Sequence, residues 1–183
     1  MTVTVSLLFI SCGKETNDEN ILYRTFNRTV TNTTGGFVID SLDLNGDTYV
    51  DAAFLLFRST SSDSAVCALI GRNSSASLVD STQSFGSLFF SKLLERGQVP
   101  VVLDPIKKEW AKGAFFASRI SAVTLGIAGA GDKFIPVAID NPLTTQYHYG
   151  WVRINVSADL KTIQVIDGAY NYIPDVPVEM GAK

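Results

Sequence analysis

Oxygen-bearing side chains stand at alternate positions in one short segment, residues 43–51. Asp43, Asn45, Asp47 and Asp51 occupy positions 1, 3, 5 and 9 of this segment, and the backbone carbonyl of Tyr49 would supply position 7. Calcium takes about six to eight oxygen ligands, and loops with this spacing wrap them around one ion. The spacing therefore predicts a calcium-binding loop.

The same segment also suits a plain turn. Asn45-Gly46 is a typical type I′ pair, and aspartate side chains accept hydrogen bonds from nearby backbone amides. Thr48 stands where calcium loops usually have glycine, and Phe54 stands where a loop that leads into a helix carries its last carboxylate. From the sequence, calcium binding and a self-capped turn remain open alternatives.

A second group of residues suited to recognition lies on a predicted strand over 147–156. Side chains alternate between the two faces of a strand, so one face presents Tyr147, Tyr149, Trp151 and Arg153. Exposed on a surface, such rings would stack on sugars while the guanidinium bonds sugar hydroxyls, forming a glycan platform. Large aromatics are more often core residues, and Trp151 would then pack under a neighbouring segment with Arg153 covering it.

Little in the sequence indicates a catalytic centre. His148 is the only histidine and no Gly-x-Ser-x-Gly motif accompanies it, so a serine triad has no support. His148 shares its strand face with β-branched residues, which predicts a buried, neutral ring. Glycoside hydrolysis needs only two carboxylates. The sequence offers several without pairing them: Glu95, Asp104, Glu109 and Asp140.

The N-terminal residues have a pattern that is typical of exported proteins. An apolar run over 3–10 ends at Ser11-Cys12-Gly13, the pattern of a secretory signal before a processing site. Phe9 to Cys12 resembles the lipobox of bacterial lipoproteins, and Lys14-Glu15 resembles the export tag of Bacteroidetes-type surface lipoproteins. The resemblance implies a signal peptide at 1–11, a lipidated tether at 12–20, and an outer-membrane anchor at Cys12 that leaves the protein facing outward.

Two features depart from that lipoprotein pattern. Phe9 replaces the usual leucine, and no Lys or Arg precedes the apolar run. The alternative is a buried N-terminal strand in which Cys12 is a small apolar residue. The polar stretch at 14–20 favours the tether. If Cys12 is lipidated, Cys67 has no disulfide partner and is expected to pack as an inert core thiol.

The elements that must position these residues are strands of one domain, 21–183. Short apolar segments alternate with clusters of turn residues, which predicts an all-β fold, a single antiparallel β-sandwich of jelly-roll or Ig-like type. Phe85, Leu88, Phe89 and Leu93 fall at helical spacing and predict at most one short helix. We expect a hairpin loop at 157–161 and a C-terminal segment, 174–183, extended along an edge. Strands are predicted over 36–39, 50–57, 64–70, 77–79, 114–118, 133–139, 147–156 and 162–166.

Composition narrows the class of function. The formal net charge is −3 and charged residues are 18% of the chain, so no basic field is available to hold nucleic acid. The body resembles a broad set of secreted β-sandwich proteins with an Asp-x-Asn-x-Asp loop, here 43–51, and a Tyr-Gly-Trp-Val-Arg strand, here 149–153. That resemblance implies no activity. We expect a non-catalytic cell-surface lipoprotein module that binds extracellular glycan or protein or serves a surface complex. The alternative is an extracellular hydrolase acting on polysaccharide.

Overall fold

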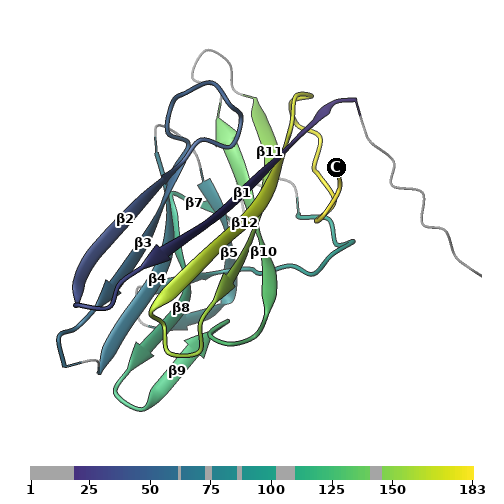
Figure 1. Cartoon of the computed structure of the whole chain (residues 1–183). Coiled ribbons are helices and arrows are strands. Elements are labelled where there is room, and N and C mark those ends of the chain that lie inside the picture. The colour runs from purple at the N-terminus through teal and green to yellow at the C-terminus, as the bar shows by residue number, and fades with distance from the viewer. Residues whose placement is uncertain (1–18, 62, 73–75, 86–87, 102–109, 141–145) are drawn as a thin grey trace, which may run out of the picture.

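The protein is described by a computed structural model, which covers residues 19–61, 63–72, 76–85, 88–101, 110–140 and 146–183 (Figure 1). Every regular element in these ranges is a β-strand. The strands form two layers, called sheets A and B, that pack face to face. The prediction of an all-β sandwich is confirmed.

The strands of sheet A are hydrogen-bonded in the order β1-β12-β11-β10-β5. Their bounds are β1 Ile21–Thr31, β12 Thr162–Asn171, β11 Tyr147–Val156, β10 Asp132–Asp140 and β5 Ala76–Phe85, with β7 Trp110–Ala111 beside β5. Strand β5 also pairs with β6 and so links the two sheets. Sheet B continues β6-β8-β4-β3-β2. Its bounds are β6 Leu88–Ser91, β8 Gly113–Ile120, β4 Ser64–Gly71, β3 Ala52–Arg58 and β2 Gly36–Leu42, with β9 Val123–Gly126 on β8.

The main core lies between the two sheets. It takes alternate residues from each strand, because side chains on a strand alternate between faces. From sheet B it includes Phe54, Leu56 and Phe116, and from sheet A Val152 and Ile154. All five side chains are fully buried.

A second, smaller core covers the outer face of sheet A. Trp151 and Phe134 of this face pack against Leu94 and against Val178 and Met180 of the C-terminal segment. The amide of Met180 donates to the carbonyl of Gln98 at 2.9 Å. The C-terminal segment therefore crosses the outer face of sheet A, and its predicted course along an edge is wrong.

The predicted helix at 85–93 is also wrong. Leu88–Ser91 is strand β6, which pairs with β5 on one side and, in parallel, with β8 on the other. A short segment whose backbone bonds are supplied by two neighbouring strands follows its tertiary partners and not its own periodicity.

Strand β1 is a long element that the apolar pattern does not reveal. Its register on β12 shifts between Thr25 and Arg28, and Asn27 has a φ of 46°. Such a bulge moves the later side chains to the opposite face and breaks the period of two. The predicted strand at 147–156 matches β11, and the predicted hairpin at 157–161 joins β11 to β12.

Among the described residues, no helix has the length and hydropathy that a membrane crossing requires.

Candidate functional site

The segment Asp43–Asp51 links β2 to β3 at one end of the sandwich. Leu44 anchors it, because its side chain is 1% exposed and lies in the main core. The side chain of Leu44 fits over Gly150 and Gly168, where an added Cβ would lie 3.1 and 2.7 Å from its methyl carbons. Glycines on two neighbouring strands of sheet A thus make the notch that fixes the loop from sheet B.

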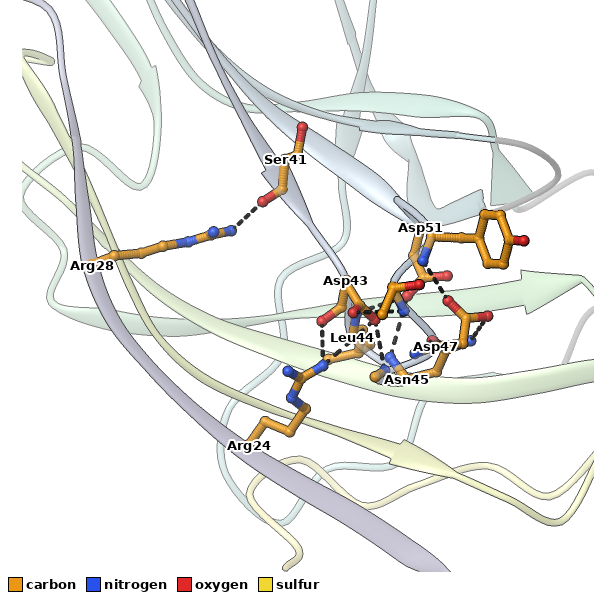
Figure 2. Close-up of polar contacts among 11 residues, drawn as sticks. Arg24, Arg28, Ser41, Asp43, Leu44, Asn45, Asp47 and Asp51 are labelled. Carbon is orange, nitrogen blue, oxygen red and sulfur yellow. Dashed lines mark hydrogen bonds and ion pairs between the residues drawn. The ribbon is translucent and has the colours of Figure 1, made fainter.

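Inside the loop, the polar side chains hold the backbone (Figure 2). Asp43 accepts hydrogen bonds from the amides of Gly46 at 2.6 Å and Thr48 at 3.1 Å. Asn45 accepts from the amide of Asp47 at 3.0 Å, and Asp47 accepts from the amide of Tyr49 at 2.8 Å. Each alternate side chain caps an amide ahead of it, so the loop is a series of Asx turns.

Asp51 closes the loop from the far end. Its carboxylate accepts from the amides of Leu44 at 2.7 Å and Asn45 at 3.2 Å, and the residue is 7% exposed. Burial raises the pKa of Asp51 above 3.8, and the charges of Asp47 and Asp43 raise it further, while the two amides lower it. The loop therefore gathers negative charge around a buried carboxylate.

The backbone of the loop is bent at two places. Gly46 has a φ of 84° and Thr48 a φ of 75°. A type I′ turn needs positive φ at both central residues, and Asn45 is not among the positive-φ residues, so the predicted Asn45-Gly46 type I′ turn is wrong. Thr48 adopts the left-handed conformation at the position where calcium loops usually have glycine, at a cost of about 1–3 kcal/mol for a residue with a branched Cβ.

One cationic side chain lies beside this loop. Arg24 of β1 donates to the carbonyl of Asp43 at 2.9 Å, and its Nη1 is 3.5 Å from the Asp43 carboxylate. The ring of Tyr49 is exposed. Within the described ranges, no three His, Cys, Asp or Glu side chains form a group that could hold a metal ion. The loop therefore consists of capped turns, with side-chain oxygen atoms at residues 43, 45, 47 and 51.

The predicted glycan platform on β11 is not formed. Tyr149 and Trp151 are each 1% exposed, so neither ring is available for stacking on a sugar. Trp151 packs edge-on against Phe134, with ring centroids 5.1 Å apart, under the C-terminal segment. The core interpretation of these aromatics is correct. Tyr147, at the start of the strand, is half-buried and bonds Asp175 through its amide at 3.1 Å.

Arg153 is held by an ion pair that the sequence does not reveal. Its Nε lies 2.9 Å from a carboxylate oxygen of Asp167 on β12, and the hydroxyl of Tyr23 donates to the other oxygen at 2.7 Å. The hydrogen bond to Asp167 is the main cause of the raised pKa of Arg153. Asp167 is buried. Only the pairing of β12 with both β1 and β11 brings these three residues together.

Two of the other candidates for chemistry, His148 and Glu95, also have structural partners. His148 is half-buried rather than fully buried, and its Nδ1 lies 3.0 Å from the carbonyl of Asn171. Because a carbonyl only accepts, Nδ1 carries the proton. Glu95 pairs with Lys133. Asp104 and Glu109 lie outside the described residues, and so does the side chain of Asp140.

The two cysteines differ in what the structure says of them. Cys67 lies fully buried in the main core, as expected, and burial raises the pKa of its thiol to about 12. Cys12, the predicted signal peptide at 1–11 and most of the tether at 12–20 lie outside the described residues. Comparisons with protein-family models, curated proteins and solved structures find no match for this chain.

Proposed function

We propose that the chain is a non-catalytic module of the bacterial cell surface that acts through a protein partner or within a surface complex. The observation behind this proposal is that the polar groups of both candidate sites hold the fold. Asp43, Asp47 and Asp51 cap backbone amides, and Arg153 is paired with Asp167. A polysaccharide ligand loses its support because Tyr149 and Trp151 are buried.

In this proposal the module is attached to the outer membrane through a lipid on Cys12 and faces outward. Support comes from the apolar run before Ser11-Cys12-Gly13 and from Lys14-Glu15. The test is the mass of the mature N-terminus. We expect an acylated Cys12 as its first residue and a full-length, unacylated chain for Cys12→Ala. If neither chain is acylated, the proposed lipid anchor is contradicted.

We also propose that the Asp43–Asp51 loop binds calcium as a structural ion. Asp43, Asn45, Asp47 and Asp51 would hold it with side-chain oxygens, and Tyr49 with its carbonyl. Burial is the main cause of the raised pKa of Asp51, and the charges of Asp47 and Asp43 add to it; a cation there would offset that added repulsion. The left-handed Thr48 supports this, since strained backbone persists where a ligand or the surrounding structure repays it. The ion would stiffen the link between β2 and β3.

Thermal unfolding with calcium and with a chelator tests the calcium loop. With a Kd of about 0.1 mM, about 10 mM calcium stabilises the folded chain by about 2.7 kcal/mol. A gain of that size raises Tm by about 5–10 °C in a domain of this length. The gain should fade as pH falls through the raised pKa of Asp51, because a protonated carboxyl is a poor ligand.

Two variants make this experiment specific. Asp47→Ala removes a proposed ligand together with the cap on Tyr49, and it should abolish the calcium gain. Asp159→Ala is the matched control, because Asp159 caps the amide of Lys161 in a different loop. It should lower the starting Tm and keep the gain. A wild-type Tm that calcium does not move, or an equal gain in both variants, would contradict the proposal.

The hydrolase alternative has its own test. It requires two carboxylates about 5–10 Å apart in a cleft, one acting as acid. Release of reducing ends from a panel of polysaccharides, lost on mutation of an acidic pair, would replace the module proposal with a glycosidase. A panel without turnover would support the module.

A further inference from the structure

Along β2, β3, β4, β8 and β9, the outward positions of sheet B, on the side turned away from sheet A, include no charged residue. The outer face that they form comprises the side chains of these strands that alternate with those of the main core. Strand register brings them into rows across the sheet, Phe37 beside Phe57 and Ile39 beside Leu55. The positions are Phe37, Ile39, Ser41, Ala53, Leu55, Phe57, Ser64, Val66, Ala68, Ile70, Gly113, Phe115, Ser118, Ile120, Val123 and Leu125.

Several of these side chains are open to solvent. Phe37 is 69% exposed, Val123 60%, Ile39 57% and Ile120 46%. They lie at both margins of this five-strand surface, on β2 and on the β8–β9 hairpin, and Leu55, Val66 and other partly buried apolar residues fill the strands between them. A sheet face that meets solvent is normally polar. A continuous apolar surface on such a face therefore marks an interaction site.

The β2 edge of sheet B is protected against the addition of another strand, whereas the outer face of the sheet is uncovered. Arg28 of β1 donates to the carbonyl of Ser41 at 2.6 Å and pairs with Asp40. A charged side chain on an edge strand blocks the addition of another strand. A partner therefore meets the flat face of the sheet and not the edge of β2.

We propose that a second copy of this chain covers this surface, with the outer faces of the two B sheets packed about a two-fold axis. An uncharged face offers no complementarity to a charged partner, whereas it matches itself. Two sheets that pack through apolar faces about 10 Å apart repeat the contact that builds the sandwich itself. A two-fold axis closes the assembly at two copies, since each covers the face of the other.

The size of the face agrees with a dimer. Five strands about 4.8 Å apart, rising about 3.3 Å per residue, give on the order of 500 Å² in projection. The accessible area is larger, because side chains stand out of the plane. A standard interface buries about 800 Å² per partner. The surface thus suits a small, reversible dimer.

Other occupants fit less well. The polar side chains on the face are serines, and a sugar needs a denser set of hydrogen-bonding groups around the ring. Proteins that rest on a bilayer place Trp, Tyr and basic residues at the lipid interface. The outward positions of β2, β3, β4, β8 and β9 include none of these residues, and the chain has a net charge of −3. A second protein surface of the same kind is the better match.

Sedimentation equilibrium of the full chain carrying Cys12→Ser tests the proposal. This change removes the lipid site, and a chelator in the buffer makes the result independent of the calcium loop. We expect the mean mass to rise with concentration from 19.8 kDa towards twice that value. Ile39→Lys should weaken dimerisation at least tenfold. Val99→Lys, which changes an equally exposed apolar residue off this face, should leave it unchanged.

Four results would overturn the proposal. Three concern association: a monomer at every soluble concentration, an equal effect of the two lysine variants, or association beyond the dimer. The fourth is binding of the monomer to neutral phosphatidylcholine vesicles that Ile39→Lys abolishes, which would make the face a lipid contact. Circular dichroism and Tm of both variants confirm that they are folded. A tenfold loss in folded Ile39→Lys alone supports the dimer.

Discussion

The two outer faces of the sandwich differ in whether the chain itself covers them. The outer face of sheet A carries Trp151 and Phe134 and is covered by Val178 and Met180 of the same chain. The outer face of sheet B carries Phe37 and its neighbours and has a solvent-exposed apolar surface. Both faces carry large apolar side chains, so the presence of such residues does not separate them. What separates them is whether a later segment of the chain returns to cover the sheet.

The covered face also contains a polar cluster. Asp167 accepts hydrogen bonds from both Arg153 and Tyr23 beside Trp151. This ion pair joins β11 to β12, and the outward positions of β2, β3, β4, β8 and β9 on the bare face contain no such charged pair. The covered face therefore serves stability, and the bare face is the one that we propose for binding.

The largest effect should come from the centre of the covered face. Trp151→Ala removes a fully buried ring and leaves a cavity between sheet A and the C-terminal segment. We expect a loss of about 3–5 kcal/mol in the free energy of unfolding, measured by urea denaturation. A loss below about 1 kcal/mol would mean that the C-terminal segment does not pack on this face.

Removal of the ion pair should have a smaller effect. Asp167→Ala leaves Arg153 without its main partner and frees the hydroxyl of Tyr23. The expected loss is about 2–3 kcal/mol, below the value for a fully buried pair, because Arg153 is partly exposed. Tyr23→Phe keeps the ion pair and removes one hydrogen bond, so it should cost about 1 kcal/mol. Equal losses in the two variants would show that the ion pair itself contributes nothing.

The smallest effect on stability should be seen on the bare face. Ile39→Lys places a charge at a position that is 57% exposed. In a dilute monomer the free energy of unfolding should change by no more than about 0.5 kcal/mol. Met180→Lys is the matched substitution on the covered face, where the residue is fully buried, and it should cost several times more. Similar losses in both would erase the distinction between the faces.

Alternating apolar residues predicted most of the fold. The strand at 147–156 and the hairpin after it were correct because the pattern there is long and uninterrupted. Strand β1 was not predicted, because its bulge at Asn27 interrupts the alternation of apolar and polar residues. The predicted helix at 85–93 failed because this short segment pairs with β5 just before it and with β8 much later in the sequence, and these pairings decide its structure.

The candidate sites were less predictable from sequence. Spacing placed Asp43, Asn45, Asp47 and Asp51 in one loop, and the structure agrees on that. Their capping bonds depend on backbone angles at Gly46 and Thr48 that local sequence does not specify. Alternation put Tyr149 and Trp151 on one face correctly, but only the positions of Leu94, Trp110 and the C-terminal segment show that this face is covered.

Binding of the dye 1-anilinonaphthalene-8-sulfonate to the native chain tests the contrast between the faces most directly. The dye fluoresces on exposed apolar surface. At concentrations where the chain is monomeric, we predict native-state binding that Ile39→Lys strongly reduces and that Val99→Lys leaves intact. Raising the protein concentration into the range where the faces pair should displace the dye. Absence of native-state binding, or binding that both variants leave unchanged, would contradict a bare apolar face on sheet B.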